Sequence, residues 1–388
     1  MKKINLFAYI YTIALIFMCC LITNAQTSNT FKELEGKVID KDTNAALNFT
    51  NIVLNESNIS TVTNSDGEFL IKIPENFSSG MLTISHLGYE KKEVKISSIK
   101  NRITIKLTPV YTELNEISIT ASALDARALL IETLGKKSSI YHNKNTLMTA
   151  FYRETIKKRR KNASLSEAVV KIHKQPYNNL RSDHIELIKV RKNTDYTKLD
   201  TLALKLQGGP FSNLYTDIIK YPDFIFTEED IPLYQFSYDS STRINKRLIY
   251  VVDFKQNKNI ATPLYFGKLY IDAETLALTN AVYSLNVSNR ELSSKMYVRK
   301  KPRKVDVYPT EATYRVNYRT KNGKWHYAYS NVSLTFKVNW KGKLFNSVYT
   351  LSSEMAITDW KVYDTKLAQV RNKLIRPSTI LSEKSSGF

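Results

Sequence analysis

Residues 311–330 read EATYRVNYRTKNGKWHYAYS and contain the pair Asn322-Gly323 between two alternating segments. Asn-Gly favours a two-residue hairpin turn, because both residues accept a positive φ at low cost. Side chains alternate between the two faces of a strand, so Arg315, Asn317 and Arg319 are expected to share one face. The opposite face is predicted to be mostly aromatic and to carry Tyr314, Val316, Tyr318, Trp325, Tyr327 and Tyr329.

Alternating segments on both sides of this hairpin extend the predicted sheet. They cover residues 148–155, 166–172, 184–190, 247–254, 265–272, 276–285 and 295–298, and the hairpin itself joins 311–319 to 324–339. A mixed segment from Gly208 to Glu229 interrupts them. A helix is expected from Leu124 to Ile140, with Leu124, Ala128, Ile131 and Leu134 at helical spacing. The order predicts one helix followed by a large antiparallel sheet.

Residues 34–107 show shorter strands at regular spacing, which is typical of a small antiparallel β-sandwich. Asp66-Gly67 is the clearest turn, with Phe69, Ile71 and Ile73 alternating after it. The fold class is therefore predicted to be mainly β, with an N-terminal sandwich and a second, larger sheet domain.

The sandwich segment contains three motifs in a fixed order. These are Gly36-x-Val38-x-Asp40, Thr63-x-x-Asp66-Gly67-x-Phe69 and Leu82-x-Ile84-x-His86-x-Gly88-Tyr89. The set resembles the carboxypeptidase regulatory-like domain, which implies a transthyretin-like (Ig-like) β-sandwich. In that family the domain is an accessory to a catalytic domain or the N-terminal part of non-peptidase outer-membrane proteins. The resemblance assigns turn and fold positions to Gly36, Asp66, Gly67, Phe69, Gly88 and Tyr89.

Three further segments are AFYRE at 150–154, SEAVV at 166–170 and GKLYID at 267–272. They resemble a region of unknown function that follows this domain in a Bacteroidetes family. That region is distantly similar to the lipoprotein-carrier (LolA-like) architecture, which implies a curved antiparallel sheet closed on one side by helices.

The N-terminus has the pattern of a signal peptide. Lys2 and Lys3 precede an apolar stretch from Leu6 to Ile22, and Thr23-Asn24-Ala25 offers small residues for cleavage before Gln26. An uncleaved anchor is the alternative, although polar residues break the stretch. Both cysteines lie inside it, so the mature chain would have neither a disulfide nor a cysteine-based zinc site. Export without cysteines fits a bacterial envelope, in the periplasm or at the outer membrane, with no transmembrane span in the mature chain.

The chain is strongly basic, with 57 Lys and Arg against 36 Asp and Glu and a net charge of +21. Export argues against nucleic acid as the partner. Two runs are predicted to form exposed hairpin loops that either contact lipid phosphates and anionic envelope polymers or act as solubilising turns. They are Lys157, Lys158, Arg159, Arg160 and Lys161, and Arg299, Lys300, Lys301, Arg303 and Lys304.

Motifs of the common enzyme classes are absent from the sequence. It contains no H-E-x-x-H, no G-x-S-x-G, no Walker A loop and no G-x-G-x-x-G. We therefore predict no catalytic residues, no metal site and no cofactor.

The predicted organisation is a signal peptide (1–25), a β-sandwich (34–107), a linker (108–122), a helix and sheet domain (123–365) and a C-terminal tail (366–388). The favoured function is a non-catalytic binding or scaffolding protein of the bacterial envelope. The aromatic face would either pack as core or line an apolar groove for an acyl chain, a lipid or a segment of an outer-membrane protein. A peptidase-associated enzyme or accessory and a cell-surface adhesin are the alternatives.

Overall fold

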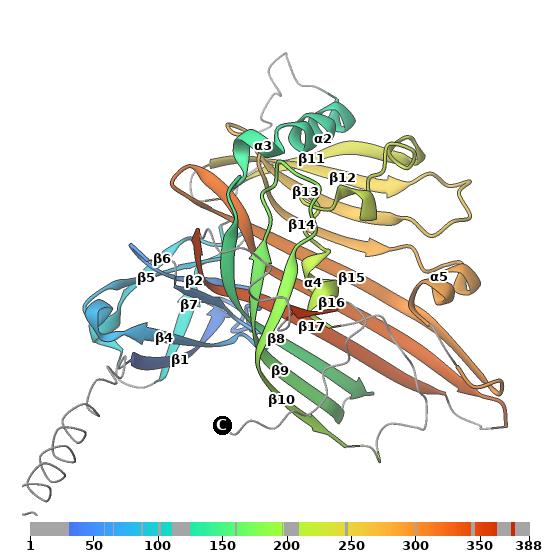
Figure 1. Ribbon diagram of the computed structural model, residues 1–388, viewed down its shortest axis with the longest axis horizontal. Helices are drawn as coiled ribbons and strands as arrows, with labels where there is room; N and C mark the ends of the chain where they lie inside the picture. Colours follow the sequence, from blue (N-terminus) through green and yellow to red (C-terminus); the bar gives the residue numbers. More distant parts are fainter. Residues whose placement is uncertain are drawn as a thin grey trace, which may run out of the picture.

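The computed structural model describes residues 31–57, 59–64, 66–86, 88–99, 102–110, 125–159, 161–195, 197, 209–244, 247–298, 301–342, 346–362 and 374–376. The predicted signal peptide, linker residues 111–122, most of the predicted tail, and Arg160, Arg299 and Lys300 lie outside this part of the chain. The described chain is mainly β and forms an N-terminal sandwich beside one large sheet (Figure 1).

The sandwich is built from two small sheets. Its strands are β1 (Phe31–Asp40), β2 (Asn51–Leu54), β3 (Ser60–Val62), β4 (Glu68–Pro74), β5 (Met81–Ser85), β6 (Lys92–Lys95) and β7 (Arg102–Leu107), with short 3-10 turns η1 (Glu75–Phe77) and η2 (Ile96–Ser98). One sheet has the order β4-β1-β7 and the other β3-β2-β5-β6. Alternate apolar side chains of both sheets, such as Leu34, Ile71 and Leu82, form the core between them.

Two features of the sandwich differ from the predicted antiparallel hairpins. Strand β1 pairs with β7 in parallel, which joins two segments far apart in the sequence. The turn at Asp66-Gly67 does not close a hairpin either, because β3 pairs with β2 while β4 pairs with β1. This turn instead carries the chain from one sheet to the other.

The second domain is one sheet of eleven strands among the described residues, in the order β11-β12-β13-β14-β15-β16-β17-β8-β9-β10-β18. Its strands are β8 (Thr146–Lys158), β9 (Lys161–Lys174), β10 (His184–Thr194), β11 (Tyr234–Ile244), β12 (Arg247–Gln256), β13 (Tyr265–Asp272), β14 (Leu278–Leu285), β15 (Val305–Lys321), β16 (Lys324–Trp340), β17 (Ser347–Val362) and β18 (Leu374–Ile375). Every pairing in this sheet is antiparallel.

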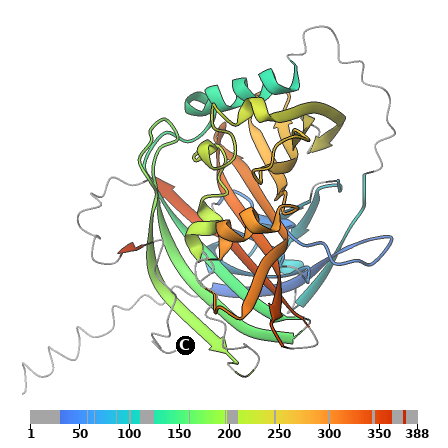
Figure 2. The same ribbon diagram turned by 90° about the vertical axis from the view of Figure 1, so that its right-hand side faces the viewer.

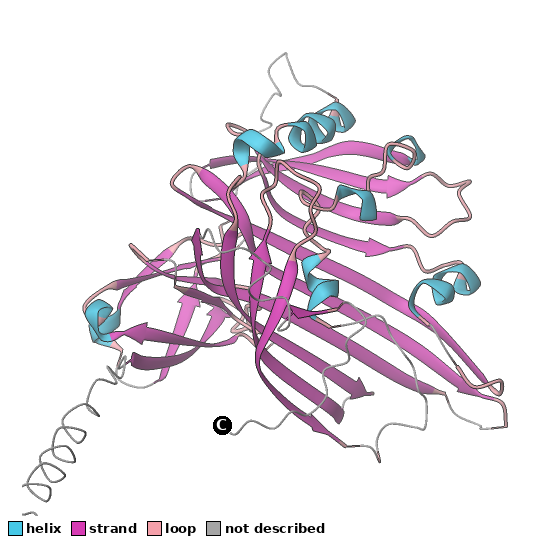
Figure 3. Ribbon diagram, viewed as in Figure 1, coloured by secondary structure: helices cyan, strands magenta, loops and turns pink. Residues whose placement is uncertain are grey.

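The large sheet is strongly curved, and its short helices gather on the hollow side (Figures 2 and 3). These are α2 (Ala126–Gly135), α3 (Lys137–Ile140), α4 (Pro210–Leu214) and α5 (Arg290–Tyr297), with 3-10 turns η3 (Pro222–Phe224) and η4 (Ile231–Leu233). We call the face that carries Tyr318 and Tyr327 and is covered by α4 the inner face, and the opposite one the outer face. The sandwich lies against the outer face.

Several predicted elements need correction. Strand β17 was not predicted, and residues 295–298, predicted as a strand, lie at the end of helix α5 and just after it. The predicted tail contributes β18, which pairs with Ile185 and Glu186 of β10. Helix α2 buries Ala126, Leu129, Leu130 and Thr133, whereas Ile131 is 50% exposed. The helix is capped by Asp125 and packs on β11, so its buried face is rotated from the predicted one.

The hairpin at Asn322-Gly323 forms between β15 and β16, and both turn residues have a positive φ. A β-bulge interrupts its register, because Asn317 pairs with Tyr329 whereas Tyr318 pairs with Tyr327. Ala328 is the extra residue, and the alternation of β16 shifts there by one position. Tyr329 therefore lies on the outer face, not on the face of Tyr327 as alternation alone predicted.

Among the described residues, no helix combines the length and the apolar character needed to cross a membrane.

Candidate functional site

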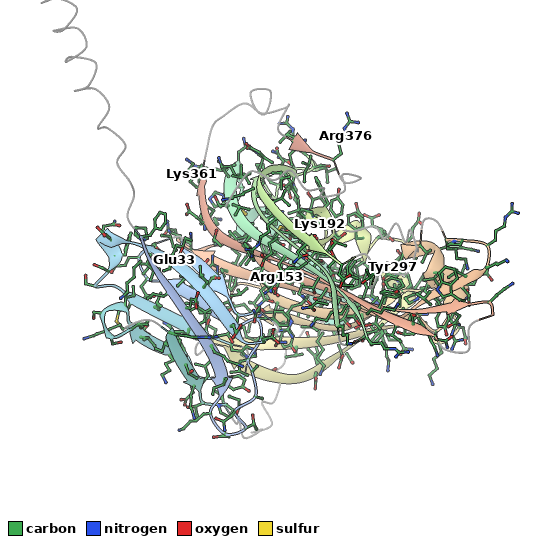
Figure 4. All side chains as sticks on the ribbon, turned by 90° about the horizontal axis from the view of Figure 1, so that it is seen from below. Glu33, Arg153, Lys192, Tyr297, Lys361 and Arg376 are labelled. Carbon is green, nitrogen blue, oxygen red and sulfur yellow. The ribbon has the colours of Figure 1, made fainter. Side chains whose placement is uncertain are left out.

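A cleft of about 900 Å³ lies between the sandwich and the outer face of the large sheet. Strands β1, β3 and β4 form one wall, and strands β8, β9, β10, β16 and β17 form the other. Its volume falls within the range of pockets that hold ligands in proteins. Figure 4 shows Arg153 at this junction, between Glu33 on the sandwich and Lys192 on β10.

The sandwich wall of the cleft carries exposed apolar side chains that are not part of the sandwich core. Phe31 is 51% exposed and Leu70 is 43% exposed, and both line the cleft with Ile59 and Val62. Gly36 also lines it, and a Cβ at this position would lie 2.5 Å from the Phe69 ring. The absence of a side chain at Gly36 therefore leaves room for the ring of Phe69, its partner across the β1–β4 pair.

The sheet wall carries an apolar row that crosses four strands. Tyr329 pairs with Ala356, Ala356 with Phe151, and Phe151 with Val169, so all four lie side by side on the outer face. Phe151 is 38% exposed. Cross-strand neighbours of this kind form a continuous surface. The row gives the cleft an apolar floor.

A row of alternating charges lies next to the apolar row. Glu354 pairs with Arg153, Arg153 with Glu167, and Glu167 with Arg191. The Arg153 Nε lies 3.6 Å from Glu167 Oε1, and Arg191 Nε donates to Glu167 Oε2 at 2.8 Å. The charges therefore neutralise one another within the row.

The Glu354 carboxyl in this row is partly buried. Burial raises its pKa, against the opposing effects of Arg153 and of the Tyr329 hydroxyl, which donates to Glu354 Oε2 at 3.3 Å. Desolvation of a charged group inside the cleft indicates that little water surrounds it.

The sandwich docks beside the cleft through a few specific contacts. The Phe49 ring lies 5.3 Å from the Tyr329 ring, and the Arg315 guanidinium lies 4.7 Å from the centre of the Phe49 ring. Ser60 Oγ donates to the carbonyl of Ile357 at 2.9 Å. Tyr329, Arg315 and the backbone of Ile357 thus belong to the docking surface of the sheet.

The structure divides the six residues of the predicted aromatic face. Val316, Tyr318, Trp325 and Tyr327 are buried on the inner face, and Tyr314 stacks on Tyr283 beside them. Tyr329 alone faces the sandwich. On the inner face these side chains pack as core, the alternative to a groove, because α4 and the segment after it cover them.

A buried polar network holds this cover in place. Lys174 Nζ lies 2.7 Å from Asp183 Oδ2 and 2.6 Å from Asp217 Oδ2. The hydroxyls of Tyr177 and Tyr318 donate to Asp217 at 2.9 and 2.8 Å. Burial would lower the pKa of Lys174, but the two carboxylates together raise it. Sequence reasoning missed this network, because its centre, Asp217, lies 43 residues from Lys174 and 101 residues from Tyr318 in the chain.

The turn residues of the first domain have separate structural roles. Gly67 and Gly88 have φ values of +75° and +82°, which glycine accepts without strain. Tyr89 OH donates to Asp40 Oδ2 at 2.6 Å, and together with backbone N–H groups it lowers the pKa of Asp40 to about 2. Asp66 is exposed at the turn.

The described residues of the two basic runs are not among those that line the cleft. Lys157 and Lys158 end β8, Arg159 lies in the turn, and Lys161 begins β9. Lys301, Arg303 and Lys304 connect α5 to β15, so the second run follows a helix and is not a hairpin between strands.

Two sequence segments supply much of the cleft. Phe151 and Arg153 come from AFYRE, and Glu167 and Val169 come from SEAVV. Their alternation predicted the strands, but only the register reveals that they face the sandwich. Among the described residues, no group of three or more His, Cys, Asp or Glu side chains could hold a metal ion.

Solved structures with a likeness to this chain have low TM-scores. A domain assigned as an outer membrane lipoprotein-sorting protein from Vibrio parahaemolyticus matches 64% of this chain and 96% of its own, with 12% identity and a TM-score of 0.28. A DUF1329 family protein from Desulfovibrio piger matches 64% and 97%, with 12% identity and a TM-score of 0.25. A LolA superfamily protein from Nitrosomonas europaea matches 64% and 97%, with 11% identity and a TM-score of 0.22. Likenesses this weak support no inference about function.

No curated protein matches the sequence. A family model described as the CarboxypepD_reg-like domain matches residues 34–119, so the N-terminal part of this chain is a CarboxypepD_reg-like domain.

Proposed function

We propose that the chain is an exported, non-catalytic binding protein of the bacterial cell envelope. The cleft between the sandwich and the outer face of the large sheet holds an apolar part of its ligand or partner. The observation that carries this proposal is the row Tyr329, Ala356, Phe151 and Val169, which faces apolar side chains of the sandwich across about 900 Å³. The N-terminal pattern of residues 2–25 supports export.

The exposure of Phe151 and Leu70 supports a binding role for the cleft. Large apolar side chains that stay accessible in a concave site gain free energy when a ligand covers them. The paired charges beside them would orient a polar group of the ligand. The cleft also lies next to the docking contacts of Phe49, so a ligand there would touch both domains.

The experiment places a charge in the apolar row. Phe151→Asp is compared with Phe266→Asp, because Phe266 is 46% exposed on β13 and does not line the cleft. Binding of a fluorescent C16 fatty acid and of a fluorescent alternating Val/Thr peptide is measured on the mature protein. We expect Phe151→Asp to weaken binding of at least one probe by about tenfold or more. The bound probe would cover the introduced carboxylate, and burying a charged group without a partner is strongly unfavourable.

Phe266→Asp should bind as the unchanged protein does. Thermal unfolding of both variants checks that they are folded. Equal binding by Phe151→Asp and the unchanged protein, or no binding of either probe, contradicts the proposed site.

A further inference from the structure

Strand β4 is an edge strand that faces the cleft. It pairs with β1 and with no other described strand, and it ends the order β4-β1-β7. Five consecutive residues, Glu68 to Lys72, line the cleft. Because neighbouring side chains point to opposite faces, five in a row can line one cleft only where it meets the edge of the strand. At about 3.3 Å per residue this edge is about 17 Å long.

The hydrogen bonds near the turn show which backbone groups of β4 point away from β1, on the open edge of the strand. Val38 N–H donates to the Gly67 carbonyl at 2.8 Å, so Gly67 is directed towards β1. Glu68 is directed away, because its carbonyl accepts from Asn64 N–H at 2.8 Å and its N–H donates to Asn64 Oδ1 at 2.9 Å. The alternation of an antiparallel pair then directs the N–H and C=O of Leu70 and Lys72 away from β1 as well.

The charges that line the cleft cancel. The five cationic side chains are Lys72, Arg102, Arg153, Lys189 and Arg191. The five anionic side chains are Glu35, Glu68, Glu167, Glu354 and Asp359. An anionic lipid headgroup would find no excess of positive charge here. A peptide backbone is neutral and offers the N–H and C=O groups that an open strand edge lacks.

We propose that the cleft binds an extended, uncharged or charge-balanced peptide segment of a partner protein, which pairs with the free edge of β4 as an added strand. Side chains on one side of this strand pack on the row of Ala356, Phe151 and Val169, while its backbone pairs with Leu70 and Lys72. Main-chain hydrogen bonds supply affinity and the apolar row selects alternating apolar residues, as in other strand additions. The inference rests on the proposed function and names its partner class.

The probe is the fluorescent peptide Ser-Val-Thr-Val-Thr-Val-Ser, compared with the same peptide N-methylated at its five central residues. Methylation removes the donors on both edges of the peptide and keeps every side chain. The methylated peptide would lose two or more hydrogen bonds to β4, so we expect it to bind more weakly than the unmethylated peptide by about tenfold or more.

A protein variant tests the same bonds from the other side. Leu70→Pro removes one N–H group from the free edge of β4 and keeps the hydrogen bonds between β4 and β1. Edge strands accept proline where the N–H points away from the neighbouring strand. Leu70→Ala shortens the same side chain and keeps the N–H, so it sets the reference. We expect Leu70→Pro to bind the peptide more weakly than Leu70→Ala.

Equal binding of the methylated and unmethylated peptides overturns strand addition, whatever the variants show. If the C16 fatty acid binds, is blocked by Phe151→Asp, and the peptide does not bind, then the proposed function stands and the peptide class is wrong. If neither probe binds, both proposals fail together.

Discussion

Single residues of the first domain act through a few short contacts. Asp40 ends β1 and accepts from the Tyr89 hydroxyl at 2.6 Å and from the N–H groups of Asp42 and Thr43 at 2.8 and 2.7 Å. These donors stabilise the carboxylate, and they bring together two motif residues that lie 49 positions apart in the sequence. The contact fastens the loop before β6 to the end of β1.

Removing one of these donors should shift the pKa of Asp40. We expect Tyr89→Phe to raise it from about 2 towards its ordinary value, because the hydroxyl is the largest of the lowering effects. A depressed pKa contributes stability above the unfolded pKa of the carboxyl, and that stability is lost as the pH falls through about 2. The contribution of Asp40 to stability at neutral pH should therefore be smaller in the variant, and it should be lost at a higher pH than in the unchanged protein. A carboxyl NMR titration measures the shift.

Tyr308→Phe, a change in the large sheet, is the matched control and should leave the titration of Asp40 as it is. A pKa of Asp40 that stays at about 2 in Tyr89→Phe would show that the backbone donors alone hold it there.

At the scale of elements, strands with strict alternation could be predicted from the sequence, but their neighbours could not. Strand β17 was missed because polar residues such as Ser352, Ser353 and Glu354 dilute its apolar alternation, although it joins β16 to β8. The bulge at Ala328 has no local Gly or Pro. It is favoured by tertiary contacts, since Asn213 Nδ2 on α4 donates to the Ser330 carbonyl at 3.2 Å.

The candidate site could not be predicted from the sequence either, because it depends on which strands and domains are neighbours. The sequence predicts that Phe151 and Val169 lie on one face of their strands, but it does not say whether that face meets helices or the sandwich. Alternation predicts the aromatic face, but it does not say whether that face lines a groove or packs as core. In the structure the inner face is covered by residues 209–233, a segment that carries little periodicity. The register of the strands and the segment that covers each face depend on residues far apart in the sequence, so only the structure shows them.

The cover over the inner face should depend on the charge of Lys174. Lys174→Met leaves Asp183 and Asp217 buried without their cation, and such a broken pair costs about 3–5 kcal/mol. We expect the free energy of unfolding, measured by denaturant titration, to fall by about that amount. Lys171→Met, on the same strand but half-buried, should change it by less than about 0.5 kcal/mol.

Adding Asp217→Asn to Lys174→Met should recover part of the loss, because one uncompensated charge is removed. Similar stabilities for Lys174→Met and Lys171→Met would mean that the network does not hold the cover.

At the scale of the whole molecule, the contact between the two domains includes a residue with a strained backbone. Phe49 has a φ of +62°, a region that a bulky side chain rarely adopts and that costs about 1–3 kcal/mol. Its ring nevertheless meets Tyr329 and Arg315, so the strain in the sandwich is offset by the contact with the sheet. The bulge at Ala328 is what brings Tyr329 to this face, and a slip of that register would remove the docking partner of Phe49.

Two substitutions separate the strain from the contact. Phe49→Ala removes the ring and keeps a strained Cβ, whereas Phe49→Gly removes both, so the sandwich should be about 1 kcal/mol more stable in the glycine variant. Both variants lose the same ring, and both should weaken docking equally.

Hydrogen exchange reports docking, with faster exchange expected at β3 and at the facing part of β17 in both proteins. Since Ser60 also donates to Ile357, some protection should remain in either variant. Exchange that stays unchanged in both would show that Ser60 and its neighbours hold the domains together without the ring, and the strain at Phe49 would then need another cause.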